Sequence, residues 1–254
     1  MRAIEDMSVL VTGGGSGIGE ATARRLVAAG ARVTITGRRQ DNLRTVQQSL
    51  GDACCAVVGD VTVADDRERM IRSALEHGSG RLDALVNNAA NMYRQPVDGY
   101  TEAFLKEAFD TNVISAMMLS SAAVPALSET QGAIIFIGST HTRRAFPGAS
   151  PYATTKAALE GLTKVMAAEL GPRQIRVGCI LPGAVVTELN LRSGHVKPDE
   201  VEARYAEVAK LHALGRVGTA DEVAESIIHL IRAEWITGVA LEVDGGIGLG
   251  VSSF

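Results

Sequence analysis

Short apolar runs rich in β-branched residues alternate with helical patterns along the chain. Between the first two runs, residues 18–29 have the pattern of a helix, with Glu20 and Arg24 four residues apart and Gly30 as a stop. Fully apolar runs separated by helices indicate a parallel sheet covered on both faces. The sequence therefore predicts one doubly wound α/β domain over residues 1–254. Its strands are expected at residues 9–12, 33–36, 54–58, 82–86, 133–137, 176–181 and 240–243.

The segment from residue 188 to residue 215 interrupts this alternation. It begins polar and irregular, and Pro198 then opens a predicted helix with Val201, Tyr205 and Val208 on one face. The segment follows the sixth strand, at the carboxyl edge where ligands bind in such sheets. We therefore expect a lid over a substrate, and the plainer alternative is a surface decoration.

The composition narrows the classes of protein that fit. The chain has 254 residues, 46% of them hydrophobic, and a formal net charge of −4, which argues against a nucleic-acid partner. Runs such as residues 133–137 are too short to cross a bilayer, and no cleavable apolar segment precedes Val9. Cys54, Cys55 and Cys179 form no disulfide framework. The sequence predicts a cytoplasmic protein with no membrane partner and no metal.

Tyr152 and Lys156 are four residues apart, so on a helix their side chains share one face. A free phenol has a pKa of about 10, and a nearby lysine cation favours the phenolate. We therefore expect Lys156 to lower the pKa of Tyr152 and to make it a usable proton donor and acceptor. The same spacing also arises by chance on solvated helix faces, so the rest of the chain decides its meaning.

A glycine-rich turn at residues 12–19, with the sequence TGGGSGIG, follows the first strand and opens the first helix. Such a turn lets the backbone approach a pyrophosphate, and the helix N-terminus offers free N–H groups. The plainer alternative is a flexible loop, which the position between strand and helix argues against.

Taken in order, these motifs resemble the short-chain dehydrogenase/reductase family over residues 9–246. The other motifs that carry the resemblance are Asn-Asn-Ala-Ala at 87–90, Thr-Asn-Val at 111–113, Gly-Ser at 138–139, Tyr-Ala-Thr-Thr-Lys at 152–156 and Pro-Gly at 182–183. The resemblance implies a Rossmann-like fold. It also implies hydride transfer between a nicotinamide dinucleotide and a ketone or secondary alcohol.

By this resemblance the catalytic residues are Asn112, Ser139, Tyr152 and Lys156. Ser139 is expected to hydrogen-bond the substrate oxygen, and Tyr152 to move the proton. Lys156 should also bind the nicotinamide ribose. Asn112 should break its helix locally and hold a water that links Lys156 to solvent. The plainer alternatives are a strand-end cap for Ser139, a polar residue inside a helix for Asn112 and a solvated Lys156.

The resemblance also implies where the cofactor lies. Asp60 should meet the adenine amino group, Asn87 the channel near the adenosine ribose, and Thr187 the nicotinamide carboxamide. The full set of expected cofactor-binding residues is Gly13, Gly15, Ser16, Gly17, Ile18, Gly19, Arg38, Arg39, Asp60, Val61, Asn87, Ala89, Tyr152, Lys156, Pro182, Gly183, Val185 and Thr187.

The end of the second strand discriminates between the two dinucleotides. A carboxylate there accepts hydrogen bonds from the ribose hydroxyls of NAD, and an arginine suits the 2′-phosphate of NADP. The chain has Arg38 and Arg39 at this point and no acid. The arginine fork matches a phosphate, so we expect NADP(H). The plainer alternative is that both arginines are solvated at a helix start, where cations are unfavourable.

Positions near the motifs suggest the substrate pocket, with Tyr93, His141 and Phe146 as its candidate residues and residues 189–195 of the lid completing it. His141 is expected to shape the pocket and hydrogen-bond there, because Tyr152 already moves the proton. A small ketone, aldehyde or alcohol is favoured.

Two alternatives stay open for the function. A 3-oxoacyl thioester carried by a carrier protein is disfavoured because residues 128–131 are acidic or neutral where carrier-dependent relatives are basic. A catalytically silent dinucleotide sensor is the other alternative, disfavoured by the intact set of four catalytic residues. Resemblance alone implies a homotetramer or homodimer.

Overall fold

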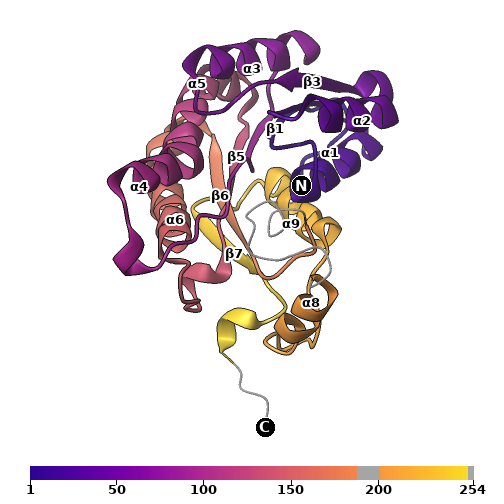
Figure 1. The fold of residues 1–254 in the computed structure, drawn as a ribbon. Helices are drawn as coiled ribbons and strands as arrows, with labels where there is room; N and C mark the ends of the chain where they lie inside the picture. Colours follow the sequence, from indigo (N-terminus) through magenta and orange to yellow (C-terminus); the bar gives the residue numbers. More distant parts are fainter. Residues whose placement is uncertain (188–200, 251–254) are drawn as a thin grey trace.

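Parallel strands form the centre of the computed structural model, which describes residues 1–187 and 201–250. Within these ranges the strands join one seven-stranded sheet in the order β3-β2-β1-β4-β5-β6-β7 (Figure 1). This order confirms the predicted doubly wound fold. The strands are β1 (Ser8–Thr12), β2 (Arg32–Gly37), β3 (Cys54–Val58), β4 (Ala84–Asn87), β5 (Ala133–Ile137), β6 (Arg176–Pro182) and β7 (Val239–Val243).

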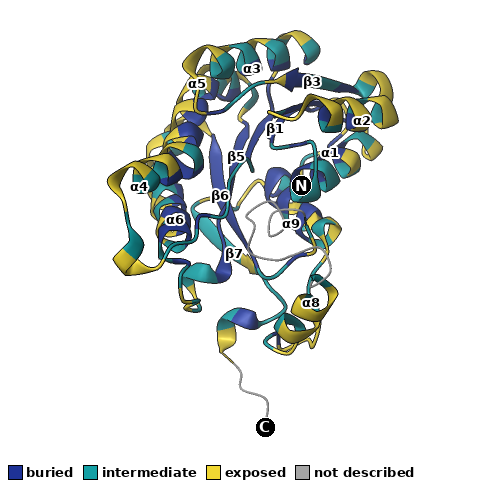
Figure 2. Ribbon diagram, viewed as in Figure 1, coloured by how far each residue is buried: buried dark blue, intermediate teal, exposed yellow. Residues whose placement is uncertain are grey.

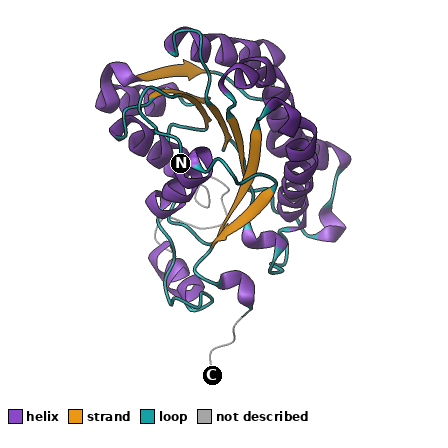
Figure 3. Ribbon diagram, turned by 180° about the vertical axis from the view of Figure 1, so that it is seen from behind, coloured by secondary structure: helices purple, strands orange, loops and turns teal. Residues whose placement is uncertain are grey.

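Helices cover both faces of this sheet, as Figure 3 shows from behind. One face carries α1 (Gly17–Ala28), α2 (Gln40–Leu50) and α9 (Ala220–Arg232). The other face carries α3 (Ala64–His77), α5 (Ser115–Thr130) and α6 (Ser150–Leu170), with α4 (Glu102–Phe109) beside α6.

The two apolar layers follow from the alternation of side chains along each strand. In β1, Val9 and Val11 join the layer under α1 and α9, whereas Leu10 joins the layer under α3 and α5. The central strands β1, β4, β5 and β6 are therefore buried on both sides, whereas the edge strands β3 and β7 are partly exposed (Figure 2). Two cysteines, Cys54 and Cys179, are buried in these layers, and all three are free thiols.

Most predicted boundaries agree with the structure to within two residues. The first helix ends as predicted, since Gly30 has a φ of +91°, and Arg24 pairs with Glu20 at 2.7 Å. The largest differences are in the fourth strand, predicted at 82–86 and found at Ala84–Asn87, and in the first glycine turn, whose helix begins at Gly17.

One helical stretch is apolar enough to be compared with a membrane span. Of the described residues, Glu102–Thr130 is long and apolar enough to cross a bilayer by length and composition alone, and 44% of its most apolar 18 residues are buried inside the protein. A helix packed against a core passes the same test, so this stretch is weak evidence for a membrane.

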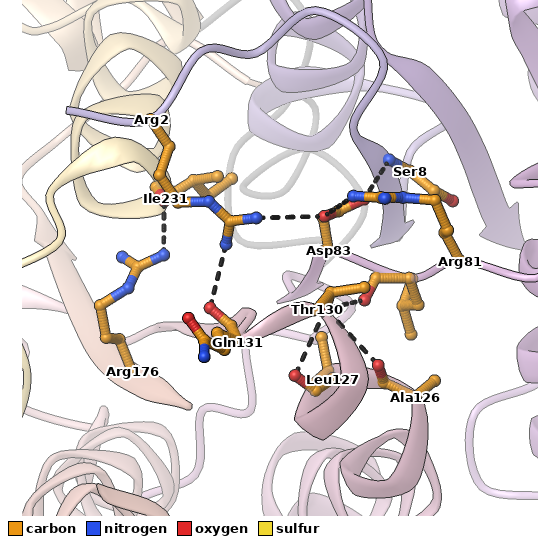
Figure 4. Close-up of polar contacts among 11 residues, drawn as sticks. Arg2, Ser8, Arg81, Asp83, Ala126, Leu127, Thr130, Gln131, Arg176 and Ile231 are labelled. Carbon is orange, nitrogen blue, oxygen red and sulfur yellow. Dashed lines mark hydrogen bonds and ion pairs between the residues drawn. The ribbon is translucent and has the colours of Figure 1, made fainter. Parts of the chain in front are cut away.

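The amino edge of the sheet is held by buried charges (Figure 4). The Asp83 carboxylate accepts the Ser8 N–H at 2.9 Å and pairs with Arg81 at 2.9 Å and Arg2 at 3.3 Å. Arg176, at the start of β6, is 9% exposed, and its guanidinium donates to the carbonyls of Leu230, Ile231 and Ala233. These carbonyls end α9 and have no partner within the helix.

Arg176→Met should destabilise the protein without changing its site. The variant leaves the buried carbonyls of Leu230 and Ile231 without this donor, and that of Ala233 with only the Ile236 N–H at 3.4 Å, so we expect the free energy of unfolding to fall by about 2–4 kcal/mol. Urea denaturation followed by circular dichroism measures this loss. The control is Arg173→Met, which changes an exposed arginine three residues earlier, before β6. Equal stability of the two variants would show that the capping contacts contribute nothing.

Candidate active site

A cavity of about 980 Å³ lies at the carboxyl edge of the sheet. Loops that follow β1 to β6 line it, together with the start of α6 and the inner face of α8 (Val201–Ala209). The strand order reverses between β1 and β4, and this is the point where open α/β sheets bind ligands. The volume of the cavity is at the upper end of the range for small-molecule sites.

The glycine turn forms one end of the cavity. Gly13 and Gly17 have φ values of +66° and +57°, which favour glycine. A Cβ on Gly19 would lie 2.4 Å from the Gly13 carbonyl oxygen, so this position cannot carry a side chain without a shift of the backbone. The turn therefore presents bare backbone to the cavity at the N-terminus of α1, which is an arrangement that fits a pyrophosphate.

Thr12 fixes the position of that turn. Its hydroxyl donates to the Val86 carbonyl at 3.3 Å and accepts the N–H groups of Asn88 and Ala89 at 2.9 and 3.0 Å. The Asn88 amide in turn donates to the carbonyls of Thr12 and Gly13. These bonds join the end of β1 to the loop after β4.

The other end of the cavity holds Ser139, Tyr152 and Lys156. Tyr152 and Lys156 share one face of α6 as predicted, and both are buried, at 5% and 3% exposed. The Lys156 ammonium lies 5.5 Å from the centre of the Tyr152 ring and donates to the Ile137 carbonyl at 2.7 Å. Ser139 follows β5, so its hydroxyl faces the same space.

The predicted effect of Lys156 on the pKa of Tyr152 is wrong for this state of the protein. Burial raises the pKa of Tyr152 to about 12, while the Ser139 hydroxyl and the Arg94 charge act in the opposite direction. Burial also lowers the pKa of Lys156 to about 8. Because both groups are buried, the cost of desolvating their charged forms outweighs the attraction between a phenolate and an ammonium group. Tyr152 therefore holds its proton at neutral pH.

His141 is a neutral, half-buried member of this cluster. Its Nδ1 lies 3.0 Å from the Ser139 hydroxyl oxygen, and its ring packs on Tyr152 and Phe146 with centroid distances of 5.2 and 4.5 Å. Burial, with the charges of Arg94 and Lys156, lowers the pKa of His141 to about 4. A neutral imidazole agrees with the predicted shaping and hydrogen-bonding role.

Asn112 breaks its helix as predicted. It lies in a π-helical turn, Asp110–Ile114, between α4 and α5. Its amide oxygen accepts the Asn91 N–H at 3.0 Å, and its nitrogen donates to the Asn91 carbonyl at 3.0 Å and the Thr155 hydroxyl at 3.1 Å. Asn112 therefore ties the loop after β4 to α6, and its predicted water contact stays a prediction.

The structure brings most of the predicted site residues to this one cavity. Three of them do not line it: Gly19 packs on Gly13, Asn112 is buried behind the loop, and Asn87 donates to the Ser120 hydroxyl at 2.9 Å. Asn88 lines the cavity in place of Asn87. The predicted residues that do line it are Gly13, Gly15, Ser16, Gly17, Ile18, Arg38, Arg39, Asp60, Val61, Ala89, Tyr93, Ser139, His141, Phe146, Tyr152, Lys156, Pro182, Gly183, Val185 and Thr187.

The predicted lid is described in part. Val201, Tyr205 and Val208 share the face of α8 that lines the cavity, as predicted. The Tyr205 hydroxyl donates to the Val185 and Thr187 carbonyls at 3.4 Å, which ties α8 to the loop after β6. The start of this helix at Pro198 and the residues 189–195 lie outside the described residues.

Sequence reasoning missed two arginines of the cavity, Arg94 and Arg204. Arg94 belongs to the irregular loop after β4, and Arg204 to α8. Neither lies in a motif, and the only signal in the sequence was that each lies close to a residue already assigned to the pocket, Tyr93 and Tyr205.

At the far end of the cavity, Arg38 and Arg39 follow β2. The Arg38 guanidinium lies 3.6 Å from the Asp60 carboxylate, and Arg39 donates to the Ser16 hydroxyl at 2.8 Å. The β2–β3 register pairs Gly37 with Val58, which brings the two strand ends together. Asp60 also accepts the N–H and hydroxyl of Thr62.

Comparisons with known proteins agree with this arrangement. The model of the family described as Enoyl-(Acyl carrier protein) reductase matches residues 13–248. Human dehydrogenase/reductase SDR family member 4 is 34% identical over 245 residues, which are 93% of this chain and 86% of that protein.

Two solved structures have the same fold. A short-chain dehydrogenase/reductase from Serratia marcescens has a TM-score of 0.88 at 35% identity, over 97% of this chain and 100% of the other. The 3-ketoacyl-(acyl-carrier-protein) reductase from Brucella melitensis, complexed with NADH, has a TM-score of 0.87 at 30% identity, over 96% and 99%.

The fold and these relatives define an oxidoreductase of the doubly wound, nucleotide-binding class. The chain belongs to the short-chain dehydrogenase/reductase family. Members of this family use a nicotinamide dinucleotide and act on CH–OH or C=O groups. Within the part of the chain that the structure describes, no group of three His, Cys, Asp or Glu residues could hold a metal ion.

His141→Gln should make stability less sensitive to acid. The unfolded imidazole takes up a proton below pH 6.5 and the buried one only below about 4, so wild-type stability falls between these values by about 3 kcal/mol on account of His141. Urea denaturation of both proteins at pH 7.5 and 4.5 measures the difference. His77→Gln, outside the cavity, is the control. An unchanged pH dependence in His141→Gln would contradict the assignment.

Proposed function

We propose that the protein is an NADP(H)-dependent enzyme that reduces ketones and, in the reverse direction, oxidises secondary alcohols. Tyr152 is its general acid and base. The observation that carries this proposal is the composition of the cavity at the carboxyl edge of the sheet, which joins a bare glycine turn at one end to Ser139, Tyr152 and Lys156 at the other. When bound, the nicotinamide supplies hydride to a carbonyl carbon or accepts it from an alcohol.

The residues near Tyr152 fit the proton side of this chemistry. Hydride addition leaves an alkoxide, which needs a proton and a hydrogen-bond donor in place beforehand. Tyr152, protonated at neutral pH, donates that proton, and the Ser139 hydroxyl donates a hydrogen bond to the same oxygen. Lys156 holds a positive charge beneath the Tyr152 ring and stabilises the phenolate that forms. A protonated Tyr152 favours reduction at neutral pH.

Two observations support NADP(H) over NAD(H). No carboxylate follows β2, and two arginines line the cavity there. They stand at the N-terminus of α2, where cations are unfavourable unless an anion is bound. A 2′-phosphate would take Arg38 from Asp60 and lie between Arg38 and Arg39. The Brucella relative was solved with NADH, so similarity of fold alone does not decide between the two dinucleotides.

Reduction of a 3-oxoacyl thioester is the second candidate, and similarity to the Brucella 3-ketoacyl-(acyl-carrier-protein) reductase is the observation in its favour. The family resemblance implies basic residues just before the fifth strand in reductases that act on carrier-bound substrates, where they would dock an acidic partner. Residues 128–131, next to β5, carry Glu129 and no cation. A free carbonyl compound therefore remains the favoured substrate.

Tyr152→Phe tests the proton transfer. The substitution keeps the ring that packs on His141 and removes the hydroxyl, so kcat for ketone reduction should fall by about 10²–10⁴-fold while NADPH affinity stays within about threefold. Steady-state NADPH consumption and a fluorescence titration of NADPH give the two numbers. Tyr100→Phe is the matched control, because Tyr100 does not line the cavity. Equal kcat values for Tyr152→Phe and Tyr100→Phe would reject Tyr152 as the proton donor.

Arg38→Asp tests the cofactor assignment. The change replaces a phosphate partner by a repelling carboxylate, so the KM for NADPH should rise about 10–100-fold relative to that for NADH. Arg44→Asp makes the same charge change on an exposed residue of α2 that does not line the cavity. A preference for NADPH that survives Arg38→Asp would overturn the assignment.

A further inference from the structure

The substrate end of the cavity carries two cations that the proposed chemistry does not use. Arg94, from the loop after β4, and Arg204, from α8, both line the space beside Tyr152. Their charges act on one another, and the charge of Arg94 also acts on Tyr152 and His141. Arg94 and Arg204 therefore come from two different elements to line the same cavity, near enough for their charges to interact.

Arg94 is half-buried and has no protein partner among the residues that the structure describes. Within the described ranges its guanidinium forms no hydrogen bond or ion pair, whereas Arg143, in the loop after β5, pairs with Glu160 and Glu242. A guanidinium has five N–H donors, and their burial is costly without acceptors. Burial and the charge of Arg204 both lower the pKa of Arg94, as expected for a cation without a counter-ion.

The carboxylates of the described cavity wall are engaged elsewhere. Only Asp60 and Glu207 line it, and Asp60 lies against Arg38 at the far end. Glu207 pairs with Lys210 at 2.7 Å. Within the described chain, the substrate end thus has the positive charges of Arg94 and Arg204 in addition to that of Lys156, and no free acid to balance them.

We propose that the carbonyl compound reduced here carries a carboxylate, which Arg94 binds through its fork and Arg204 attracts from α8. The substrate class is thus an oxo acid, or the hydroxy acid in reverse. This inference rests on the proposed function and names the substrate class of the same site. An arginine fork and a carboxylate form two parallel hydrogen bonds, which fix the position of a small substrate beside Tyr152.

A carboxylate on the substrate explains the position of Arg94 better than a phosphate on a distant carrier. The charge of Arg94 acts directly on Tyr152, so the anion it binds must lie near the reacting carbonyl. In a carrier-bound thioester, by contrast, the phosphate lies many bonds away from the carbonyl. Arg204, which is exposed on α8, is placed to attract the anion as it enters.

Matched substrate pairs test the inference. Benzoylformate, acetoacetate and levulinate place the carboxylate next to the carbonyl, one carbon away and two carbons away, and each is assayed beside its methyl ester with NADPH. We expect the wild-type kcat/KM to favour at least one acid over its ester by about tenfold or more. Esters that react as well as or better than all three acids would overturn the inference and leave the ketone reductase intact.

Variants of the two arginines locate the effect. Arg94→Gln should raise the KM for the preferred acid by about 10–100-fold and leave the ester within about twofold, since only the acid loses a charged hydrogen bond. Arg94→Lys should recover part of the loss, and Arg204→Gln should have a smaller effect, of about three- to tenfold, because Arg204 is exposed. Arg72→Gln, on α3 outside the cavity, should change nothing. Equal losses for acid and ester in Arg94→Gln would overturn the inference.

A binding measurement separates this inference from the proposed function. If no carbonyl compound in the panel is reduced, the proposed function fails. Calorimetric titration of the NADPH-saturated protein with the three acids and their esters then decides the inference. Binding of an acid but not its ester, lost in Arg94→Gln, would support the carboxylate site, and absence of binding by all three acids would overturn it.

Discussion

The Thr12 hydroxyl joins the end of β1 to the loop after β4, and the position of the cavity depends on this junction. This one oxygen forms hydrogen bonds with three backbone groups at the point where the strand order reverses. These bonds hold the end of β1 and the loop after β4 together. The glycine turn is thereby held against the loop that continues to Asn91, and through Asn91 to Asn112. Hydrogen bonds thus connect the cofactor end of the cavity to α6, which carries Tyr152.

Burial controls the protonation states of the residues at the substrate end of the cavity. Lys156, Tyr152 and His141 lie together with little access to water, and in each case desolvation is the largest influence on the pKa. These pKa shifts keep Tyr152 protonated and His141 neutral at neutral pH. Lys156 remains a cation there, with a pKa below its usual value. A bound dinucleotide and substrate would add their own charges to this end of the cavity. The pKa values of these groups in the complex would therefore differ from those of the free protein.

The sequence predicted the strands, the turn and most of the cavity wall, because these depend on local patterns and on motifs of fixed spacing. It failed where the outcome depends on burial or on loop paths. Asn87 is a different kind of miss: the motif assigned it to the cavity, although strand alternation places it on the face of Leu85, where it donates to Ser120. The pKa of Tyr152 required knowledge of how little water reaches it. Arg94 lies in a loop without a periodic pattern, and only the folded chain shows where it points.

The π-helical turn at Asp110–Ile114 gives the stretch Glu102–Thr130 a chain length that cannot be altered freely. A π-turn is an α-helix with one residue inserted, and each residue turns a helix by about 100°. Loss of a single residue there would restore a regular helix and rotate α5 by that angle relative to α4. The apolar side of α5 would turn away from the sheet, and Asn112 would no longer reach both Asn91 and Thr155. Point substitutions in this helix can be absorbed locally, whereas a one-residue deletion would change the phase of everything that follows.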